Sequence, residues 1–297
     1  MSMFPAVSPE FFNADYLGTF TSDDAEWHRI RSEGIGGSEI GTVMGLNPWE
    51  SAYALWAKKT GKIEDSFKGN TATRVGKLLE EPVLKMFAED HPELELFTAG
   101  TFASKDMPFM HANPDALARH RETGEWYVIE AKTARYPWDT APQHYVAQVQ
   151  HYMDVLGIGE AYIVALAGME PYEQFIEADH YEQAVQRDAA FRFWQKVRND
   201  VKPEWDGSES TYQAVRFQYP QIEDREVELG ELGINLWNAQ RKLDEAQSEL
   251  NEYKSAVLDV MGYARTAMVT FDDNPPVKVA SRQMRGGKPA LIINKKG

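Results

Sequence analysis

Two stretches of the chain place acidic side chains in an extended, apolar setting that could hold a metal ion. The stretch WYVIEAKTA at residues 126–134 is a strand-like run that carries Glu130 and Lys132. Because side chains two positions apart on a strand point to the same face, this acid and this base should lie side by side. The second stretch, MHANPDALA, carries Asp115 directly after a proline.

The turn RETG between these stretches predicts a hairpin in which the two acids meet. Asp115 and Glu130 are equally distant from its midpoint, between Glu122 and Thr123. In a simple hairpin they would be cross-strand neighbours with Cβ atoms about 5 Å apart. Two carboxylates that close repel each other unless one is protonated or a cation lies between them. Mg²⁺ or Mn²⁺ would suit these oxygen ligands, and Lys132 could then orient a water or stabilise an attacked phosphate.

Similar acid–lysine pairs occur elsewhere in the chain without this setting. Glu252 and Lys254 lie in a helical pattern, and Asp200 and Lys202 lie in a polar segment. Both pairs are expected to be solvated surface charges. The hairpin and its apolar strand, rather than the triplet of residues alone, therefore carry the metal-site hypothesis.

The segments around the hairpin predict an α/β fold, a mixed sheet flanked by helices. Apolar spacing, with glycines and prolines at the ends, predicts helices near residues 22–34, 38–45, 47–61, 70–90, 142–157 and 180–200. Strand-like stretches lie near residues 94–100, 101–118, 125–134, 160–168 and 171–179. We therefore expect one mixed α/β domain over residues 1–205.

A different kind of sequence follows a predicted linker at residues 206–225. Apolar residues recur there at alternating spacings of three and four: Leu229, Leu232, Leu236, Ala239, Leu243, Ala246, Leu250, Tyr253, Val257 and Val260. This heptad pattern predicts a long helix that could pair with another copy, fold back on the first domain, or bind a partner. We expect residues 226–297 to form this helix, a short β-hairpin and a basic tail.

Composition narrows the possible classes of protein. The chain has 297 residues, no cysteine and a net charge of −15. It has neither a long apolar run nor a signal-like N-terminus, which predicts a cytoplasmic protein. Without cysteines there can be no disulfide, zinc–thiolate site or iron–sulfur cluster. No nucleotide-binding Gly-Lys-Ser/Thr loop is present, so we expect no ATP hydrolysis.

Together, the motifs resemble those of a known nuclease family. NPDAL and VIEAKTA resemble the PD-(D/E)xK motif, which implies a restriction-endonuclease-like core. The surrounding sequence is similar to the YqaJ-type viral recombinases, whose best-known relative is phage lambda exonuclease. RSEGIGGSEIGTVMGLNPW, LWAKKTGK, VGKLLEEP and YVAQVQHYMDVLG resemble further family segments in the same order. The resemblance covers about residues 25–180.

The resemblance implies a role for each matching residue. Asp115, Glu130 and the carbonyl of Ala131 would bind metal, and Lys132 would position the attacking water. Glu80 matches a helical acid that binds a second ion, although a one-residue shift would select Glu81 instead. From local sequence alone, Glu80 could equally be a solvated helix residue.

Three further positions match the family pattern. Gln148 matches a glutamine near the lysine, with Gln150 as a possible helper. Arg31 and Ser38 match residues that hold the phosphate at a DNA 5′ end, with Ser38 also placed to cap a helix. The alternatives are a plain N-cap for Ser38 and a surface charge for Arg31.

The function implied is a 5′→3′ double-strand DNA exonuclease of phage or prophage recombination that uses two Mg²⁺ or Mn²⁺ ions. Double-stranded DNA ends, a single-strand annealing protein and a ring-shaped homotrimer are the implied partners. The alternatives are an endonuclease or single-strand nuclease on the same core, and a non-catalytic scaffold that binds DNA ends. Trp49, Trp56 and Trp138 could stack on bases or belong to the core.

Overall fold

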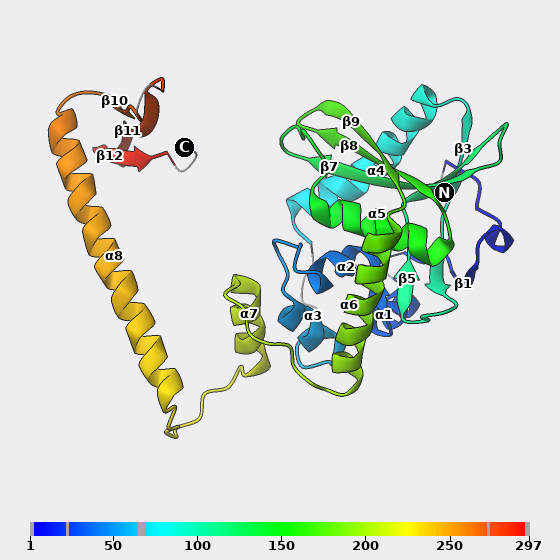
Figure 1. The fold of residues 1–297 in the computed structure, drawn as a ribbon, viewed down its shortest axis with the longest axis horizontal. Coiled ribbons are helices and arrows are strands. Elements are labelled where there is room, and N and C mark those ends of the chain that lie inside the picture. Colours follow the sequence, from blue (N-terminus) through cyan, green and yellow to red (C-terminus); the bar gives the residue numbers. More distant parts are fainter. Residues whose placement is uncertain (1–2, 22–23, 65–68, 272–273, 295–297) are drawn as a thin grey trace. The chain divides into compact units, whose positions relative to one another are not determined.

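The computed structural model describes residues 3–21, 24–64, 69–271 and 274–294, which form two compact units, residues 1–222 and 223–297 (Figure 1). Residues 22–23 of the first predicted helix lie outside the described residues. No helix in the described ranges is long and apolar enough to cross a membrane. Each unit is described separately below.

The helices of unit 1 largely follow the predicted ranges. They are the short 3₁₀ helix η1 (Pro9–Phe11) and the α-helices α1 (Ala25–Ser32), α2 (Gly37–Val43), α3 (Ala52–Lys59), α4 (Thr71–Asp90), α5 (Gln143–Leu156), α6 (His180–Arg198) and α7 (Glu209–Gln218). Local sequence accounts for several ends. Ser51 caps α3 by accepting a hydrogen bond from Ala54 N, and Gly157 ends α5 with a φ of 72°.

A five-stranded sheet forms the centre of unit 1. Its order is β3 (Leu94–Thr98), β6 (Ala116–His120), β7 (Trp126–Ala134), β8 (Glu160–Ala167) and β9 (Glu170–Glu177). Strands β6 and β7 form the predicted antiparallel hairpin, with Ala116 opposite Ile129. Continuing this register places Asp115 opposite Glu130. Strands β7 and β8 are parallel, and helix α5 makes the crossover between them.

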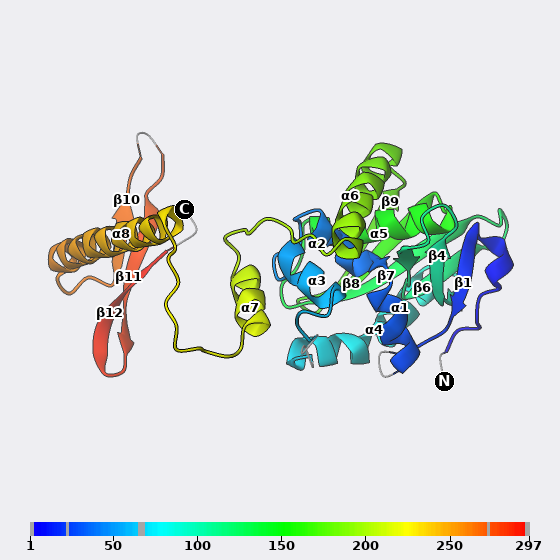
Figure 2. The same cartoon turned by 90° about the horizontal axis from the view of Figure 1, so that it is seen from below.

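Helices cover both faces of this sheet, as the views in Figures 1 and 2 show. Val83, Leu84 and Phe87 of α4 pack with Ile129 and Ala131 on one face. On the other face Val128 packs among residues of α5. Since side chains alternate along β7, Glu130 and Lys132 share the face of Val128 and point towards α5. The predicted mixed α/β fold is confirmed.

A second sheet extends unit 1, with the order β1 (Ala14–Gly18), β4 (Thr101–Ser104), β5 (Met110–Ala112) and β2 (Ile35–Gly36). The stretch 101–118, expected to be continuously extended, is therefore divided between the two sheets. The predicted linker also contains structure, because α7 lies within it. Ser210 Oγ accepts a hydrogen bond from Ser51 N at 2.8 Å, and the hydroxyl of Thr211 lies 2.7 Å from that of Ser51. These contacts attach α7 to the start of α3.

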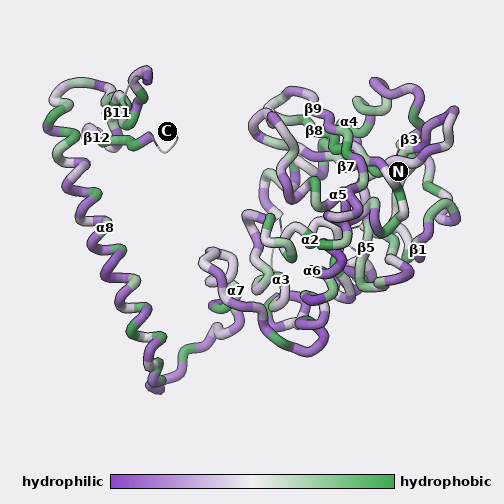
Figure 3. The backbone as a smooth tube through the Cα atoms, viewed as in Figure 1, coloured by the Kyte–Doolittle hydropathy of each residue, from purple (hydrophilic) through white to green (hydrophobic). Residues whose placement is uncertain are grey.

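Unit 2 consists of the long helix α8 (Glu231–Met261) and a small antiparallel sheet. The sheet contains β10 (Thr266–Val269), β11 (Val277–Arg285) and β12 (Lys288–Ile293). Most of the sequence expected as a basic tail is therefore strand, because the Gly286–Gly287 turn brings β12 back against β11. Along α8 polar and apolar residues alternate (Figure 3), and heptad residues such as Leu236 and Leu243 are exposed within the described unit.

Candidate active site

Three acids and one lysine meet where the β6–β7 hairpin approaches α4. Asp115 lies directly before β6, Glu130 and Lys132 lie on β7, and Glu80 lies on α4. A cavity of about 690 Å³ is lined by Glu80, Asp115, Ala131 and Lys132. The side chain of Glu130 is buried behind this cavity with 2% exposure. The structure thus brings together four of the predicted site residues and the carbonyl-bearing Ala131.

The carboxylate of Glu130 is held by hydrogen bonds at one oxygen only. Its Oε1 accepts from Lys132 Nζ at 2.5 Å and from Gln148 Nε2 at 2.6 Å. Its Oε2 is buried and has no hydrogen-bond partner among the residues that the structure describes. An unpaired buried carboxylate oxygen is costly, because burial removes the water that would otherwise solvate it. This oxygen is therefore available to a ligand in the site.

Burial raises the pKa values of the three acids, and crowding adds to this effect for Glu130 and Glu80. Burial, followed by the nearby charge of Asp115, raises the pKa of Glu130 to about 8. Burial and Asp115 likewise raise the pKa of Glu80 to about 7. Burial also raises the pKa of Asp115, although Lys132 and the Ala131 N–H, which donates to Asp115 Oδ2 at 2.8 Å, oppose it. The site therefore holds more carboxyl groups than its surroundings can stabilise in the charged form, and in the metal-free chain some of them retain protons at neutral pH.

Lys132 is the cation that partly offsets these acids. Burial lowers its pKa, but Glu130 and Asp115 outweigh burial, and the pKa is raised overall. Its ammonium also lies 4.7 Å from the ring centroid of Tyr145, a cation–π contact. Lys132 is therefore charged at neutral pH and fixed in position between the acids and an aromatic ring.

The donor atoms of this site fit a hard divalent cation. Carboxylates and a backbone carbonyl are the ligands that Mg²⁺ and Mn²⁺ prefer. A cation would give Glu130 Oε2 a partner and would lower the raised pKa values of Glu130 and Glu80. In the described ranges no three His, Cys, Asp or Glu side chains already form a closed metal-binding group. The fit thus rests on the donor chemistry and on the unpaired oxygen.

One face of α5 supplies the predicted Gln148 together with two tyrosines that the sequence interpretation missed. Tyr145, Gln148 and Tyr152 are spaced three and four residues apart and so share a helical face. The Tyr152 hydroxyl accepts from Gln148 Nε2 at 3.0 Å and holds the amide that contacts Glu130. The spacing around Gln148 was a usable signal for both tyrosines.

Gln150 and Glu81, which the sequence analysis kept as alternative site residues, have partners away from the cavity. The Gln150 amide donates to Glu177 O at 2.7 Å, at the end of β9, so it is turned away from the cavity. Glu81 accepts from Met3 N at 2.9 Å, whereas Glu80 lines the cavity. Successive residues on a helix point about 100° apart, so only one of two neighbouring acids can face the site.

The predicted phosphate residues, Arg31 and Ser38, lie in a neighbouring ionic cluster and at the start of α2. Arg31 donates to Glu39 Oε1 at 2.9 Å, and Lys59 Nζ contacts both oxygens of Glu39. The expected capping role of Ser38 is wrong, because the N-cap is Gly36 and Ser38 is exposed in the first turn. Gly36 N donates to Glu39 Oε2 at 3.0 Å and closes that turn instead.

The start of α2 packs against the candidate catalytic residues at Gly37. A Cβ atom at Gly37 would lie 2.3 Å from Tyr152 Cε1, so the ring of Tyr152 is packed directly against the backbone of α2. Tyr152 in turn contacts Gln148, which contacts Glu130. The start of α2 is thereby connected to the acids through three successive contacts.

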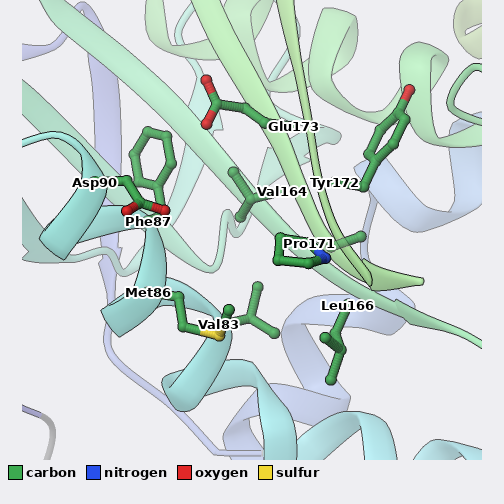
Figure 4. Close-up of a pocket in the computed structure, with 10 residues that line it drawn as sticks. Val83, Met86, Phe87, Asp90, Val164, Leu166, Pro171, Tyr172 and Glu173 are labelled. Atoms are coloured by element: carbon green, nitrogen blue, oxygen red, sulfur yellow. The ribbon is translucent and has the colours of Figure 1, made fainter. Parts of the chain in front are cut away.

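A smaller hollow of about 100 Å³ lies between α4 and the strands β8 and β9 (Figure 4). Apolar side chains including Val83, Phe87 and Val164 line most of it. Glu173, at its side, contacts His91 Nε2 at 3.0 Å. The lining of this hollow includes the acids Asp90 and Glu173 but no lysine or arginine, whereas the larger cavity combines two acids with Lys132. The larger cavity is therefore the better candidate active site.

Comparison with known sequences identifies relatives of this chain. Residues 26–159 match the model of the YqaJ-like viral recombinase domain. The uncharacterized protein YqaJ of Bacillus subtilis (strain 168) is 30% identical over 212 residues, which are 68% of this chain and 65% of that protein. The chain thus spans slightly less than two thirds of this relative. The family resemblance recognised from the motifs is confirmed.

Solved structures with a similar fold include an alkaline exonuclease from Laribacter hongkongensis. That structure has a TM-score of 0.50 and 18% identity, covering 60% of this chain and 94% of the other. The same enzyme in complex with dAMP has a TM-score of 0.51, with the same identity and coverage. This likeness shows a shared fold.

Proposed function

We propose that this chain, whose residues 26–159 match the model of the YqaJ-like viral recombinase domain, is a divalent-metal-dependent DNA exonuclease. It would degrade one strand of double-stranded DNA from the 5′ end, in phage or prophage recombination. The observation that carries the proposal is the unbalanced group of three acids and one lysine beside a cavity, with Glu130 Oε2 buried and without a partner in the described part of the chain.

The acids would hold the metal ions. Asp115, Glu130 and the carbonyl of Ala131 are the proposed ligands of one ion, and Glu80 contributes to a second. When bound, such ions supply Lewis-acid stabilisation of the charge that develops on the phosphodiester. The raised pKa values of Glu130 and Glu80 describe the metal-free chain, in which the acids retain protons that a bound cation would displace.

Lys132 and Gln148 would act on the attacking water and on the acids. The Lys132 ammonium is fixed at Glu130 Oε1 and faces the cavity, where it orients a water towards the phosphorus atom. Attack forms a new P–O bond and breaks the P–O3′ bond, which releases a 5′-mononucleotide and leaves a new 5′ phosphate. Gln148 fixes the carboxylate of Glu130, and Tyr152 fixes Gln148.

Arg31 and the start of α2 would hold the terminal 5′ phosphate. The Arg31 side chain is 40% exposed, and its contact with Glu39 fixes its direction. Ser38 is exposed close to Gly37, which packs against Tyr152. A guanidinium and a hydroxyl are suitable donors to a phosphate monoester. Preference for a 5′-phosphorylated end follows from this assignment.

The test is cleavage of linear duplex DNA labelled at either end, with Mg²⁺ or with EDTA. We expect Mg²⁺-dependent release of mononucleotides from 5′-phosphorylated ends. Lys132→Ala should lower the rate by roughly 10²–10³-fold, the usual cost of losing one fixed charged donor. Lys254→Ala, in the other Glu-x-Lys triplet of the chain, is the matched control and should leave the rate unchanged.

Other outcomes assign other functions. Cutting of closed circular DNA would identify an endonuclease on the same core. Tight binding of DNA ends without cleavage under any metal condition would refute the enzyme and favour a scaffold. Equal rates for Lys132→Ala and wild type would show that the cleavage does not use this site.

A further inference from the structure

The three tryptophans that could stack on bases have different environments. Trp56 is buried at 2% exposure in the core. Trp138 is partly buried and packs against Tyr145 and Tyr172, with ring centroids 5.7 and 5.4 Å away. Trp49 is 68% exposed. Core packing therefore explains the first two tryptophans and leaves Trp49 without a structural role.

Although its ring is exposed, Trp49 is held in place. Its backbone N–H donates to Asn47 Oδ1 at 2.9 Å, and Asn47 is itself fixed by donating to Thr42 Oγ1 at 2.8 Å. The Trp49 ring meets His144 edge to face, with centroids 5.1 Å apart and planes at 88°. One side of an aromatic ring is thus supported by the protein while much of its surface faces solvent.

Trp49 lies at the candidate active site. It lines the same cavity as Glu80, Asp115 and Lys132. His144, which supports it, lies 4.1 Å from the ring of Tyr145, the residue under the Lys132 ammonium. An aromatic wall formed by Trp49, His144 and Tyr145 therefore begins at the lysine and ends in an exposed indole.

The surroundings of Trp49 favour a base over a phosphate. On its other side, Trp49 lines a second hollow whose wall includes Asp206 and Glu209. Their negative charge would repel a phosphodiester backbone. An indole face, in contrast, stacks on any nucleobase without regard to sequence. A strand whose phosphate lies at Lys132 could thus place a neighbouring base on Trp49 but not continue into the second hollow.

We propose that Trp49 is a stacking platform for a nucleobase next to the scissile phosphate. This proposal rests on the proposed nuclease function and adds the subsite that receives an unpaired base. Trp49 would bind the terminal nucleotide of the degraded strand after it leaves its complement. We therefore expect similar binding of all four bases, because stacking does not depend on the hydrogen-bonding edge of the base.

The test uses full-length chains that carry Lys132→Ala, which slows cleavage, in Mg²⁺. The probe is a 5′-phosphorylated duplex with 2-aminopurine at its 5′-terminal position. Stacking on Trp49 should quench the probe fluorescence on binding. Adding Trp49→Ala should remove most of this quenching and weaken binding by about tenfold, whereas Trp49→Phe should retain much of both. Trp237→Ala removes another exposed tryptophan, from α8, and is the matched control that should change neither.

The outcomes separate this inference from the function on which it rests. Unchanged quenching and affinity in Trp49→Ala, with normal cleavage by the wild type, would overturn the platform and leave the nuclease intact. Failure of the wild type to cleave any DNA would instead overturn the nuclease. Because Trp49 is exposed, loss of its ring should leave the thermal unfolding midpoint unchanged, which circular dichroism can verify.

Discussion

Two clusters of charged side chains in the described part of unit 1, each built around a buried glutamate, differ in whether their charges balance. The closed cluster consists of Glu39, Lys59 and Arg31. Burial alone would raise the pKa of Glu39, but Lys59 and Arg31 outweigh it and hold the pKa at about 2. Both carboxylate oxygens of Glu39 have partners. This cluster is satisfied by the protein alone.

The open cluster consists of Asp115, Glu130, Glu80 and Lys132. Three acids face one ammonium, and burial raises the pKa of Glu130 to about 8. Within the described ranges, its Oε2 has no hydrogen-bond partner. Composition hardly distinguishes the two clusters, because both combine Glu with Lys. The ratio of charges does distinguish them, and it indicates that the closed cluster stabilises the fold while the open cluster requires something from outside.

The largest expected effect comes from removing a charge in the open cluster. Glu130→Gln should lower the cleavage rate by roughly 10²–10³-fold, as expected when one fixed charged group is lost. The same change removes an excess buried negative charge, so the metal-free unfolding midpoint at pH 8 should be equal or higher. Nuclease assays and thermal unfolding in EDTA measure the two effects. Loss of stability together with activity would contradict the contrast between the clusters.

In the closed cluster, in contrast, removing the carboxylate charge should lower the stability of the fold. Glu39→Gln leaves the Lys59 ammonium, 5% exposed, without its counter-charge, and should lower the free energy of unfolding by about 3 kcal/mol. Denaturant titration measures this loss. Glu33→Gln, which alters an exposed contact with Arg29, is the control and should cost less than about 0.5 kcal/mol. Equal effects of the two variants would show that Glu39 is not structurally special.

Metal-free stability should also depend on pH in a direction set by the open cluster. The folded-state pKa of Glu130, about 8, exceeds the ordinary value of 4.5, so the folded chain binds more protons between these pH values. The contribution of Glu130 to folding stability is therefore fully present below pH 4.5 and is lost as the pH rises to 8. Thermal unfolding in EDTA should show this decline, and Glu130→Gln should reduce it. Mg²⁺ should oppose it, stabilising most at high pH.

The smallest expected effect concerns positioning within the open cluster. Tyr152→Phe removes the hydroxyl that holds Gln148, a loss of about 1 kcal/mol, and should lower kcat about fivefold with little change in KM. Steady-state kinetics on duplex ends measures both constants. Tyr16→Phe removes a surface hydroxyl that contacts Thr19, and should have no effect. A rise in KM alone would assign Tyr152 to substrate binding instead.

Local signals in the sequence predicted much of the site, because a hairpin is a local structure. The turn after His120 fixed the register that brings Asp115 opposite Glu130, and residues in one strand fixed the direction of Lys132. Helical spacing likewise predicted most helix ranges. These features depend on neighbours within about fifteen residues.

Features that depend on distant partners could not be predicted in the same way. Gln150 follows Gln148 by two residues, yet its amide donates a hydrogen bond to the carbonyl oxygen of Glu177. That residue lies at the end of β9, far from Gln150 in the sequence. The residue type and position of Ser38 are typical of a helix cap. In the structure, however, Glu39 closes the turn by accepting a hydrogen bond from Gly36 N. The net charge of each ionic cluster could not be predicted either, because each cluster combines side chains from elements that are distant in the sequence.

The position of β7 between β6 and β8 limits where unit 1 can be shortened. The residues that match the family model end at 159, and β8 begins at Glu160. A fragment cut at that point would lose the partner of β7 on one side, over the eight paired positions from Tyr127 to Ala134. An exposed edge of this kind invites pairing with other chains. Such a fragment should aggregate, so a soluble fragment must extend at least through Glu177, the end of β9.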